Sequence, residues 1–197
     1  MKILLTAFDP FGGESVNPAE EAVKQVSAPA GVELVKLTVP TVFGKSIDCV
    51  AEALAQQDYD AVLCIGQAGG RSELTVERVA INVNDASIPD NAGVQLCDTP
   101  IIENGPAAYF ATIPVKAVCE GIRAAGVPAS VSNTAGTFVC NQLLYGVLHT
   151  IALSGKTTRA GFIHVPYIPA QVLDKSGKPS MALPTIVRGI EAALAAL

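Results

Sequence analysis

The chain contains 197 residues, of which 50% are hydrophobic and 16% charged, and its formal net charge is −5. This size and composition allow one sizeable core, so we expect a single domain over residues 1–197. The acidic balance and the lack of a basic cluster exclude nucleic acid as a partner. No apolar run is long enough to cross a membrane and no secretory signal pattern is present. We therefore expect no membrane association and a cytoplasmic location.

The cysteines agree with that location. They are odd in number, widely spaced and mostly within apolar runs, at positions 49, 64, 97, 119 and 140. This pattern favours reduced thiols over a disulfide framework. High apolar content with few charges also favours burial of part of the surface in a homo-oligomer.

Short apolar runs bounded by Gly, Pro or Asp predict buried strands. These runs are residues 2–6, 32–39, 61–65, 79–83, 129–132 and 161–165. Helical patterns lie between them: one begins at Pro18 behind the N-cap residue Asn17, and the others cover 45–57, a segment from 114, a segment from 140, and 184–197. Strands that alternate with helices predict an α/β fold, with a mostly parallel twisted sheet and helices on both faces.

Two segments interrupt this alternation. Residues 84–114 are rich in Asp, Asn, Pro and Gly and are too long for an ordinary connection, and residues 169–180 are similar but shorter. Loops of this kind are usually functional. In open parallel sheets, ligands bind at the carboxyl ends of the strands. We therefore expect Cys140 and the residues after positions 65 and 83 to meet on that side.

Several binding motifs are absent. Residues 44–46 and 155–157 resemble the end of a phosphate-binding loop but lack its first glycine, and no dinucleotide fingerprint is present. With only two histidines and no Cys-x-x-Cys or His-x-x-x-His spacing, we predict no metal site. His149 falls with Gln142 and Tyr145 on the polar face of a predicted helix, which indicates a solvated side chain.

Cys140 lies where a turn containing Gly136 gives way to a helix, after a short predicted strand. A thiol at a helix N-terminus, near unpaired N–H groups, has a lowered pKa and is a better nucleophile. The alternative is a small core residue, because Cys140 also begins an apolar stripe along the helix, and free cysteines are usually buried and inert.

His164 ends an apolar run at the carboxyl end of a predicted strand, on the same edge as Cys140. A histidine in such a run is most often a core residue, but the shared edge favours a thiol–imidazole pair. Such a pair needs a third group to orient the imidazole. Glu77, beside a glycine-rich turn, is the carboxylate nearest a strand end; alone it would more often be a solvated charge.

Motifs along nearly the whole chain resemble the pyroglutamyl peptidase I family of cysteine omega-peptidases. They are Leu5–Gly13 with Asn17–Pro18, Pro40–Phe43, Gly66–Arg71, Glu77–Asn82, Ile88–Asn91, Ser132–Asn141 and Phe162–Pro169. The resemblance implies a three-layer α/β/α sandwich that removes N-terminal pyroglutamyl residues from peptides, without a metal or organic cofactor. It also implies a homo-oligomer, with a tetramer favoured and a dimer as the alternative.

The resemblance further implies site residues. Cys140 would be the nucleophile, His164 the general base and then acid, and Glu77 the carboxylate that orients the imidazole. The implied lactam-binding residues are Phe8, Phe11, Phe138 and Val139, with Gln67, Asn17 and Thr41 as polar candidates; for Phe11 and Phe138, core packing is the alternative.

One position departs from the family pattern. Many members carry an arginine before Ile-Pro-Asp-Asn, where this chain has Ser87. If that arginine helps to hold the oxyanion, this chain must use another donor or do without one. Arg71 and Arg78 are near in sequence, but the sequence does not bring either to the site.

Two other functions stay open from the sequence. A related cysteine amidase could use the same triad on another small acyl group, which an altered lactam pocket would favour. A catalytically silent α/β protein that binds a small molecule could hold Cys140 as a structural residue. The presence of His164 and Glu77 favours the peptidase.

Overall fold

A central sheet of six strands, in the order β2-β1-β3-β8-β4-β7, organises the computed structural model, which describes residues 1–197. Its strands are β1 (Lys2–Phe8), β2 (Glu33–Val39), β3 (Ala61–Gln67), β4 (Leu74–Glu77), β7 (Ala129–Ser132) and β8 (Arg159–Val165). All neighbouring strands are parallel except β4 and β8, which are antiparallel. The predicted mostly parallel sheet is therefore confirmed, with β4 and β7 running against the other four strands.

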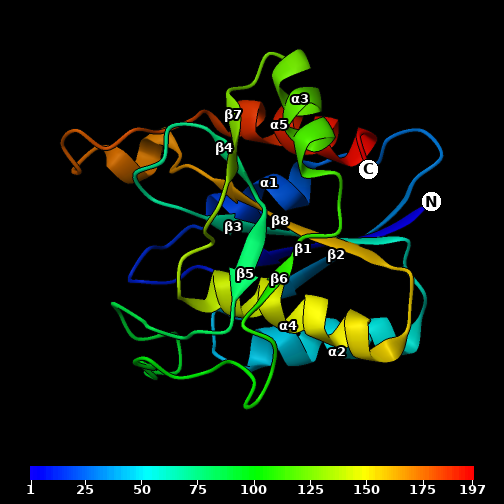
Figure 1. The fold of residues 1–197 in the computed structure, drawn as a ribbon. Coiled ribbons are helices and arrows are strands. Elements are labelled where there is room, and N and C mark those ends of the chain that lie inside the picture. The colour runs from blue at the N-terminus through cyan, green and yellow to red at the C-terminus, as the bar shows by residue number, and fades with distance from the viewer.

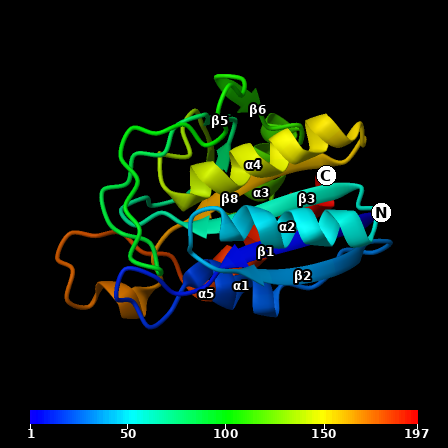
Figure 2. The same cartoon turned by 90° about the horizontal axis from the view of Figure 1, so that it is seen from below.

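Helices cover both faces of this sheet (Figures 1 and 2). On one face lie α1 (Pro18–Gln25), α3 (Val115–Ala124) and α5 (Leu183–Ala195), and on the other lie α2 (Lys45–Gln56) and α4 (Val139–Ser154). Each face has its own apolar cluster, because successive strand residues point to opposite sides. In β3, for example, Leu63 joins the α1/α3/α5 side and Val62 the α2/α4 side. The predicted three-layer α/β/α sandwich is confirmed.

The start of α1 matches the sequence pattern closely. Asn17 is the N-cap residue, and its Oδ1 accepts the Ala19 N–H at 3.0 Å. Pro18 occupies the first helical position, where its missing N–H costs nothing. The other helices begin and end within two residues of their predicted bounds where bounds were given.

Two strand assignments differ from the prediction. The run predicted at 79–83 is the short β5 (Val79–Ile81), which pairs with β6 (Ala108–Phe110) in a separate two-stranded sheet. The strand that enters the main sheet is instead β4, all of whose residues are buried. The sequence pattern does not predict β4 as a buried strand, because this strand ends in Glu77 and acidic residues normally lie at the surface.

The polar face predicted for α4 is covered. Gln142 and Tyr145 are buried, and the Tyr145 ring stacks on His149, whose Nδ1 lies 2.9 Å from the Tyr109 hydroxyl. The β5–β6 sheet and the long loop beside it lie over this face (Figure 1). The solvated face predicted from sequence is therefore wrong, because a segment distant in sequence packs on it. None of the helices combines the length and apolar character that a membrane crossing requires.

Candidate active site

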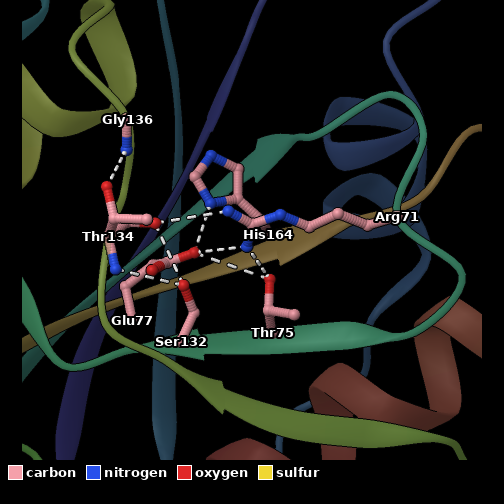
Figure 3. Close-up of polar contacts among 7 residues, drawn as sticks. All are labelled: Arg71, Thr75, Glu77, Ser132, Thr134, Gly136 and His164. Carbon is pink, nitrogen blue, oxygen red and sulfur yellow. Dashed lines mark hydrogen bonds and ion pairs between the residues drawn. The ribbon is translucent and has the colours of Figure 1, made fainter.

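The register of three strands brings His164 and Glu77 together. His164 on β8 pairs with Gly66 on β3 and with Thr75 on β4. Residues two apart in a strand share a face, so Glu77 lies diagonally across from His164. Its Oε1 is 2.7 Å from His164 Nδ1 (Figure 3). Glu77 is fully buried and His164 is 4% exposed, so the bond is shielded from water.

This hydrogen bond determines the tautomer of the imidazole. An ionised carboxylate can only accept, so Nδ1 of His164 carries the proton and donates it to Glu77. Nε2 is then left with a free lone pair and can accept a proton from another group. The Phe162 ring, with its centroid 4.7 Å from that of the imidazole, packs against it and restrains its plane.

Cys140 reaches the same face of the sheet from the first turn of α4. It is the second residue of that helix, after the N-cap Phe138. A Cβ atom at position 66 would lie 3.0 Å from the Cys140 sulfur and 2.7 Å from the Phe162 ring. Glycine at position 66 therefore leaves the space that the thiol occupies, and Gly66 is the register partner of His164. Thiol and imidazole thus lie over adjacent strands.

The environment of the Cys140 thiol and of the His164 imidazole favours the neutral form of each. Burial raises the pKa of the Cys140 thiol to about 12, and the Glu77 charge acts in the same direction. Burial lowers the pKa of His164 below its usual value, although Glu77 opposes the shift. This direction is opposite to the lowered thiol pKa expected from the helix N-terminus, because loss of solvation and a nearby carboxylate both favour the neutral thiol.

Glu77 itself stays ionised. Burial would raise the pKa of its carboxyl group, but the hydrogen bond and charge of His164, together with the Arg71 hydrogen bond, lower it below the usual range. The Ser132 hydroxyl lies beside the carboxylate and donates to the Thr134 carbonyl at 3.0 Å (Figure 3). The site thus holds one fixed negative charge next to a neutral imidazole.

The sequence analysis expected Cys140 to meet the residues after positions 65 and 83, and these segments do come together: Gly66 lies against the Cys140 sulfur, and the Asp85 N–H donates to the Thr137 carbonyl at 2.9 Å. The expected parallel direction of the strand before Cys140 is wrong. Because β7 runs opposite to β8, its last residue, Ser132, pairs with Glu77 rather than lying beside the ends of β3 and β8. Residues 133–138 carry the chain from there to Cys140. The residues after position 83 belong to the loop and not to the main sheet.

Arg71, which the sequence did not bring to the site, contacts it directly. Its Nη1 donates to Glu77 Oε1 at 2.6 Å and also to the Thr75 hydroxyl, and its Nη2 donates to the Thr134 carbonyl at 3.2 Å (Figure 3). The available signal was its position in the turn between β3 and β4, a few residues before Glu77. No group of three or more His, Cys, Asp or Glu side chains could hold a metal ion.

Aromatic side chains gather beside the start of α4. The Phe138 ring lies 6.2 Å from that of Phe11 and 5.4 Å, edge to face, from that of Phe43. Phe8 is buried in the apolar cluster against which Phe43 and Phe138 pack, with its ring 6.5 Å from that of Phe162. The structure thus brings Phe11 and Phe138 together, as expected of one pocket, and adds Phe43, which the sequence analysis did not single out. Whether they bind a lactam stays a prediction.

The remaining candidates occupy framework positions. The Asn17 side chain donates to the Asp9 carbonyl at 3.0 Å while it caps α1. Thr41 donates to Asp9 through its backbone N–H, at 2.7 Å, and through its hydroxyl, at 3.1 Å. Both are buried and hold the loop after β1, and Val139 is buried in the α2/α4 cluster. Their contact with a substrate stays a prediction, as does that of Gln67.

A thiol, an imidazole and a carboxylate on a three-layer α/β/α frame define the class of cysteine-type hydrolases. The comparisons agree with this class: the model of the pyroglutamyl peptidase family matches residues 1–197. A pyrrolidone-carboxylate peptidase of Thermoanaerobacter sp. (strain X514) is 55% identical over 195 residues, 98% of this chain and 96% of that protein. One from Streptococcus suis (strain 05ZYH33) is 54% identical and covers 100% of this chain and 92% of its own.

Solved structures agree as well. Pyroglutamyl peptidase I of Bacillus amyloliquefaciens has a TM-score of 0.94 and 50% identity, covering 98% of this chain and 94% of its own. A variant pyrrolidone carboxyl peptidase from the hyperthermophile Pyrococcus furiosus has a TM-score of 0.95 and 38% identity, covering 100% and 97%. The chain belongs to the pyroglutamyl peptidase family. It is therefore a cysteine-type peptidase that acts on N-terminal pyroglutamate.

Proposed function

We propose that Cys140 is the nucleophile of this peptidase, His164 its general base and acid, and Glu77 the carboxylate that orients the imidazole. The observation that carries the proposal is the 2.7 Å hydrogen bond between Glu77 and His164. The Cys140 sulfur packs against Gly66, the register partner of His164 on the adjacent strand. A nucleophile next to a base that a third group orients is what nucleophilic catalysis requires.

The reaction proceeds in two halves. His164 Nε2 takes the thiol proton while the Cys140 sulfur attacks the pyroglutamyl carbonyl carbon, which gives a tetrahedral oxyanion. The leaving amine receives that proton from His164, and a pyroglutamyl thioester remains. Water, deprotonated by the same imidazole, then releases pyroglutamate and restores the thiol. Because burial raises the pKa of the resting thiol to about 12, the thiol is neutral at rest and needs His164 to take its proton for the attack.

Backbone donors of α4 hold the oxyanion. The first-turn N–H groups of a helix have no intrahelical acceptor, and no side chain caps this helix. The N–H of Cys140 is one of these groups and is attached to the nucleophile itself. Such donors stabilise the charge that develops in the transition state. They supply the stabilisation at a site where Ser87, which is exposed, replaces the arginine common in the family.

The lactam ring binds against Phe11, Phe43 and Phe138, next to the nucleophile. The rings of Phe11 and Phe43 are each tilted against that of Phe138, and Phe8 and Val139 belong to the buried cluster that Phe43 and Phe138 pack on; these rings offer apolar walls for a flat five-membered ring. Asn17 and Thr41 keep the loop that carries Phe11 in place through Asp9.

Gln67 supplies a polar contact, and its orientation follows from Gln171. Gln171 Oε1 accepts the Ile168 N–H at 3.2 Å, and its Nε2 donates to the Val16 carbonyl at 3.2 Å. Both backbone partners are unambiguous, so Gln171 presents a donor to Gln67 Oε1 at 3.0 Å. Gln67 Nε2 is thereby left to donate to the lactam carbonyl. Proline lacks this carbonyl, and we expect discrimination of about 10⁴-fold.

The chain acts as one catalytic domain over residues 1–197, because both apolar clusters pack on a single sheet. It works in the cytoplasm, which suits five unpaired cysteines.

The chain assembles into a homo-oligomer, with a tetramer favoured over a dimer. Phe110 on β6 and Leu153 on α4, 69% and 75% exposed, are apolar side chains that a second copy would cover.

Release of a fluorogenic amine from a pyroglutamyl amide and from the matched prolyl amide, under reductant, tests these roles. We expect the wild type to turn over only the pyroglutamyl amide, and Cys140→Ser to turn over neither. Cys49→Ser, which changes a partly exposed thiol on α2, is the matched control and should behave as wild type. Full activity of Cys140→Ser would overturn the nucleophile, and turnover of the prolyl amide would overturn the lactam pocket.

A further inference from the structure

Arg71 is the one charged group outside the three proposed catalytic residues that bonds to them. It leaves the turn between β3 and β4 and reaches three acceptors on two different segments (Figure 3). We propose that Arg71 is a positioning residue of the peptidase reaction: its guanidinium fixes which Glu77 oxygen faces His164 and fastens that carboxylate to the segment leading into the nucleophile's helix. This inference rests on the proposed roles of Glu77, His164 and Cys140.

The two oxygens of Glu77 are in unequal surroundings. Oε1 accepts from Arg71 at 2.6 Å and from His164 at 2.7 Å, and the Thr75 hydroxyl, itself bound by Arg71, lies 3.5 Å away. Oε2 is buried and accepts no hydrogen bond. The terminal torsion of a glutamate is broad and nearly two-fold, so the side chain alone does not select one oxygen. The Arg71 guanidinium fixes the torsion, because its hydrogen bond holds Oε1 within reach of the Nδ1–H of His164.

The second link of Arg71 runs toward Cys140. Nη2 donates to the Thr134 carbonyl at 3.2 Å, and Thr134 lies in the segment that joins β7 to α4. The Thr134 hydroxyl in turn accepts the Gly136 N–H at 3.1 Å (Figure 3). One guanidinium therefore ties the carboxylate to the turn that sets the position of the nucleophile. A single amine could not make these contacts in the same geometry.

The charge of Arg71 also acts on the base. Its positive charge opposes protonation of His164 and so lowers the pKa of that imidazole, against the upward pull of Glu77. The other titratable or charged groups of the packed elements are the thiols of Cys140 on α4 and Cys64 on β3, Tyr145 and His149 further along α4, and Arg159 at the start of β8. The charged residues of α1 (Glu20, Glu21 and Lys24) lie on the far side of the sheet. Removal of Arg71 should therefore raise the pKa of His164.

NMR titration of the histidine rings tests this without any substrate, because the chain has only two histidines. We expect Arg71→Met to shift the His164 titration to higher pH, and Arg71→Lys, which keeps the charge, to shift it less. Arg78→Met is the control, because Arg78 follows Glu77 in the sequence but its side chain makes no hydrogen bond or ion pair. We expect this variant to leave the His164 titration unchanged. An unchanged His149 signal, from a ring stacked on Tyr145, reports that each variant is folded.

Activity provides the second readout. We expect kcat/KM of Arg71→Met to fall about 10- to 100-fold, as is usual when a supporting partner is removed, with its acid limb moved to higher pH. A His164 titration and pH profile that superimpose on those of wild type would overturn the proposal and leave Arg71 a structural residue. Inactive wild-type protein would overturn the proposed function alone, because the NMR titration decides the Arg71 question independently.

Discussion

The two faces of the central sheet bury different chemistry. Along β8, Ile163 enters the aliphatic cluster under α1, α3 and α5, whereas the next residue, His164, lies on the α4 side. Along β4, Val76 and Glu77 divide in the same way. The α1/α3/α5 face therefore buries mainly apolar side chains, whereas the α2/α4 face buries an apolar cluster and, next to it, the hydrogen-bonded Glu77 and His164. With the proposed roles of His164 and Glu77, stability and catalysis fall to alternate residues of the same strands.

Neighbouring substitutions in β8 should separate the two roles most clearly. His164→Gln should lower kcat about 10⁴-fold or more, because no other group can accept the thiol proton. Ile163→Ala should cost about 2–5 kcal/mol of unfolding free energy and leave kcat of the folded fraction near wild type. Urea unfolding and amide hydrolysis measure both quantities. A strong loss of kcat in Ile163→Ala would contradict the division of the faces.

Two glycines allow a second comparison. Gly66→Ala places a Cβ 3.0 Å from the Cys140 sulfur, whereas Gly161→Ala places one 2.2 Å from Ile113 on the opposite face. Both should destabilise by about 1–3 kcal/mol through overpacking. Only Gly66→Ala should also lower kcat, about 10²-fold, because it displaces the nucleophile. Equal kcat values in the two variants would show that the thiol does not occupy the space beside Gly66 during catalysis.

The pH profile sharpens the account of the site face. Below its pKa, His164 is protonated and cannot accept the thiol proton, so kcat/KM should fall about tenfold for each further pH unit. Because burial lowers the pKa of His164, this limb should lie below about pH 6.5, the usual value. Thiol ionisation, with a pKa of about 12, should add no limb in the neutral range. An acid limb above pH 7 would contradict the lowered pKa of His164, whereas an alkaline limb in the neutral to mildly alkaline range would indicate a resting thiolate–imidazolium pair, which is lost when the imidazolium gives up its proton.

The smallest effect is expected in the aromatic pocket. Phe43→Leu removes one edge-to-face contact with Phe138, which is worth about 0.5–1.5 kcal/mol. We expect KM for the pyroglutamyl amide to rise a few-fold with kcat little changed. Phe110→Leu, on an exposed strand outside the site, is the control. A kcat effect as large as that of Gly66→Ala would mean that Phe43 positions the nucleophile rather than the ring.

The sequence predicts most of the fold because its signals are local. The Asn17–Pro18 start of α1 and the apolar run that ends at His164 each specify an element without reference to the rest of the chain. The reversal of β4 and β7 is not visible in this way, because strand direction depends on pairing between distant segments. Glu77 was predicted from motif and position, but its burial in a strand was not.

The electrostatics of the site were the least predictable part. A helix N-terminus indicates a low thiol pKa, whereas the folded protein surrounds Cys140 with apolar groups and a carboxylate, which raise it. The role of Arg71 likewise could not be predicted from its place in the Gly66–Arg71 motif, since that role depends on three acceptors that only the folded chain brings together. Charge effects of this kind require the positions of all neighbours.

Trapping the acyl-enzyme tests the central claim most directly. An activated pyroglutamyl ester, quenched in acid during turnover and followed by digestion and mass spectrometry, reports which residue carries the acyl group. The account predicts one pyroglutamyl group on Cys140 and none in Cys140→Ser. A pyroglutamyl group on any of the other four cysteines, or turnover without an acylated thiol, would contradict it.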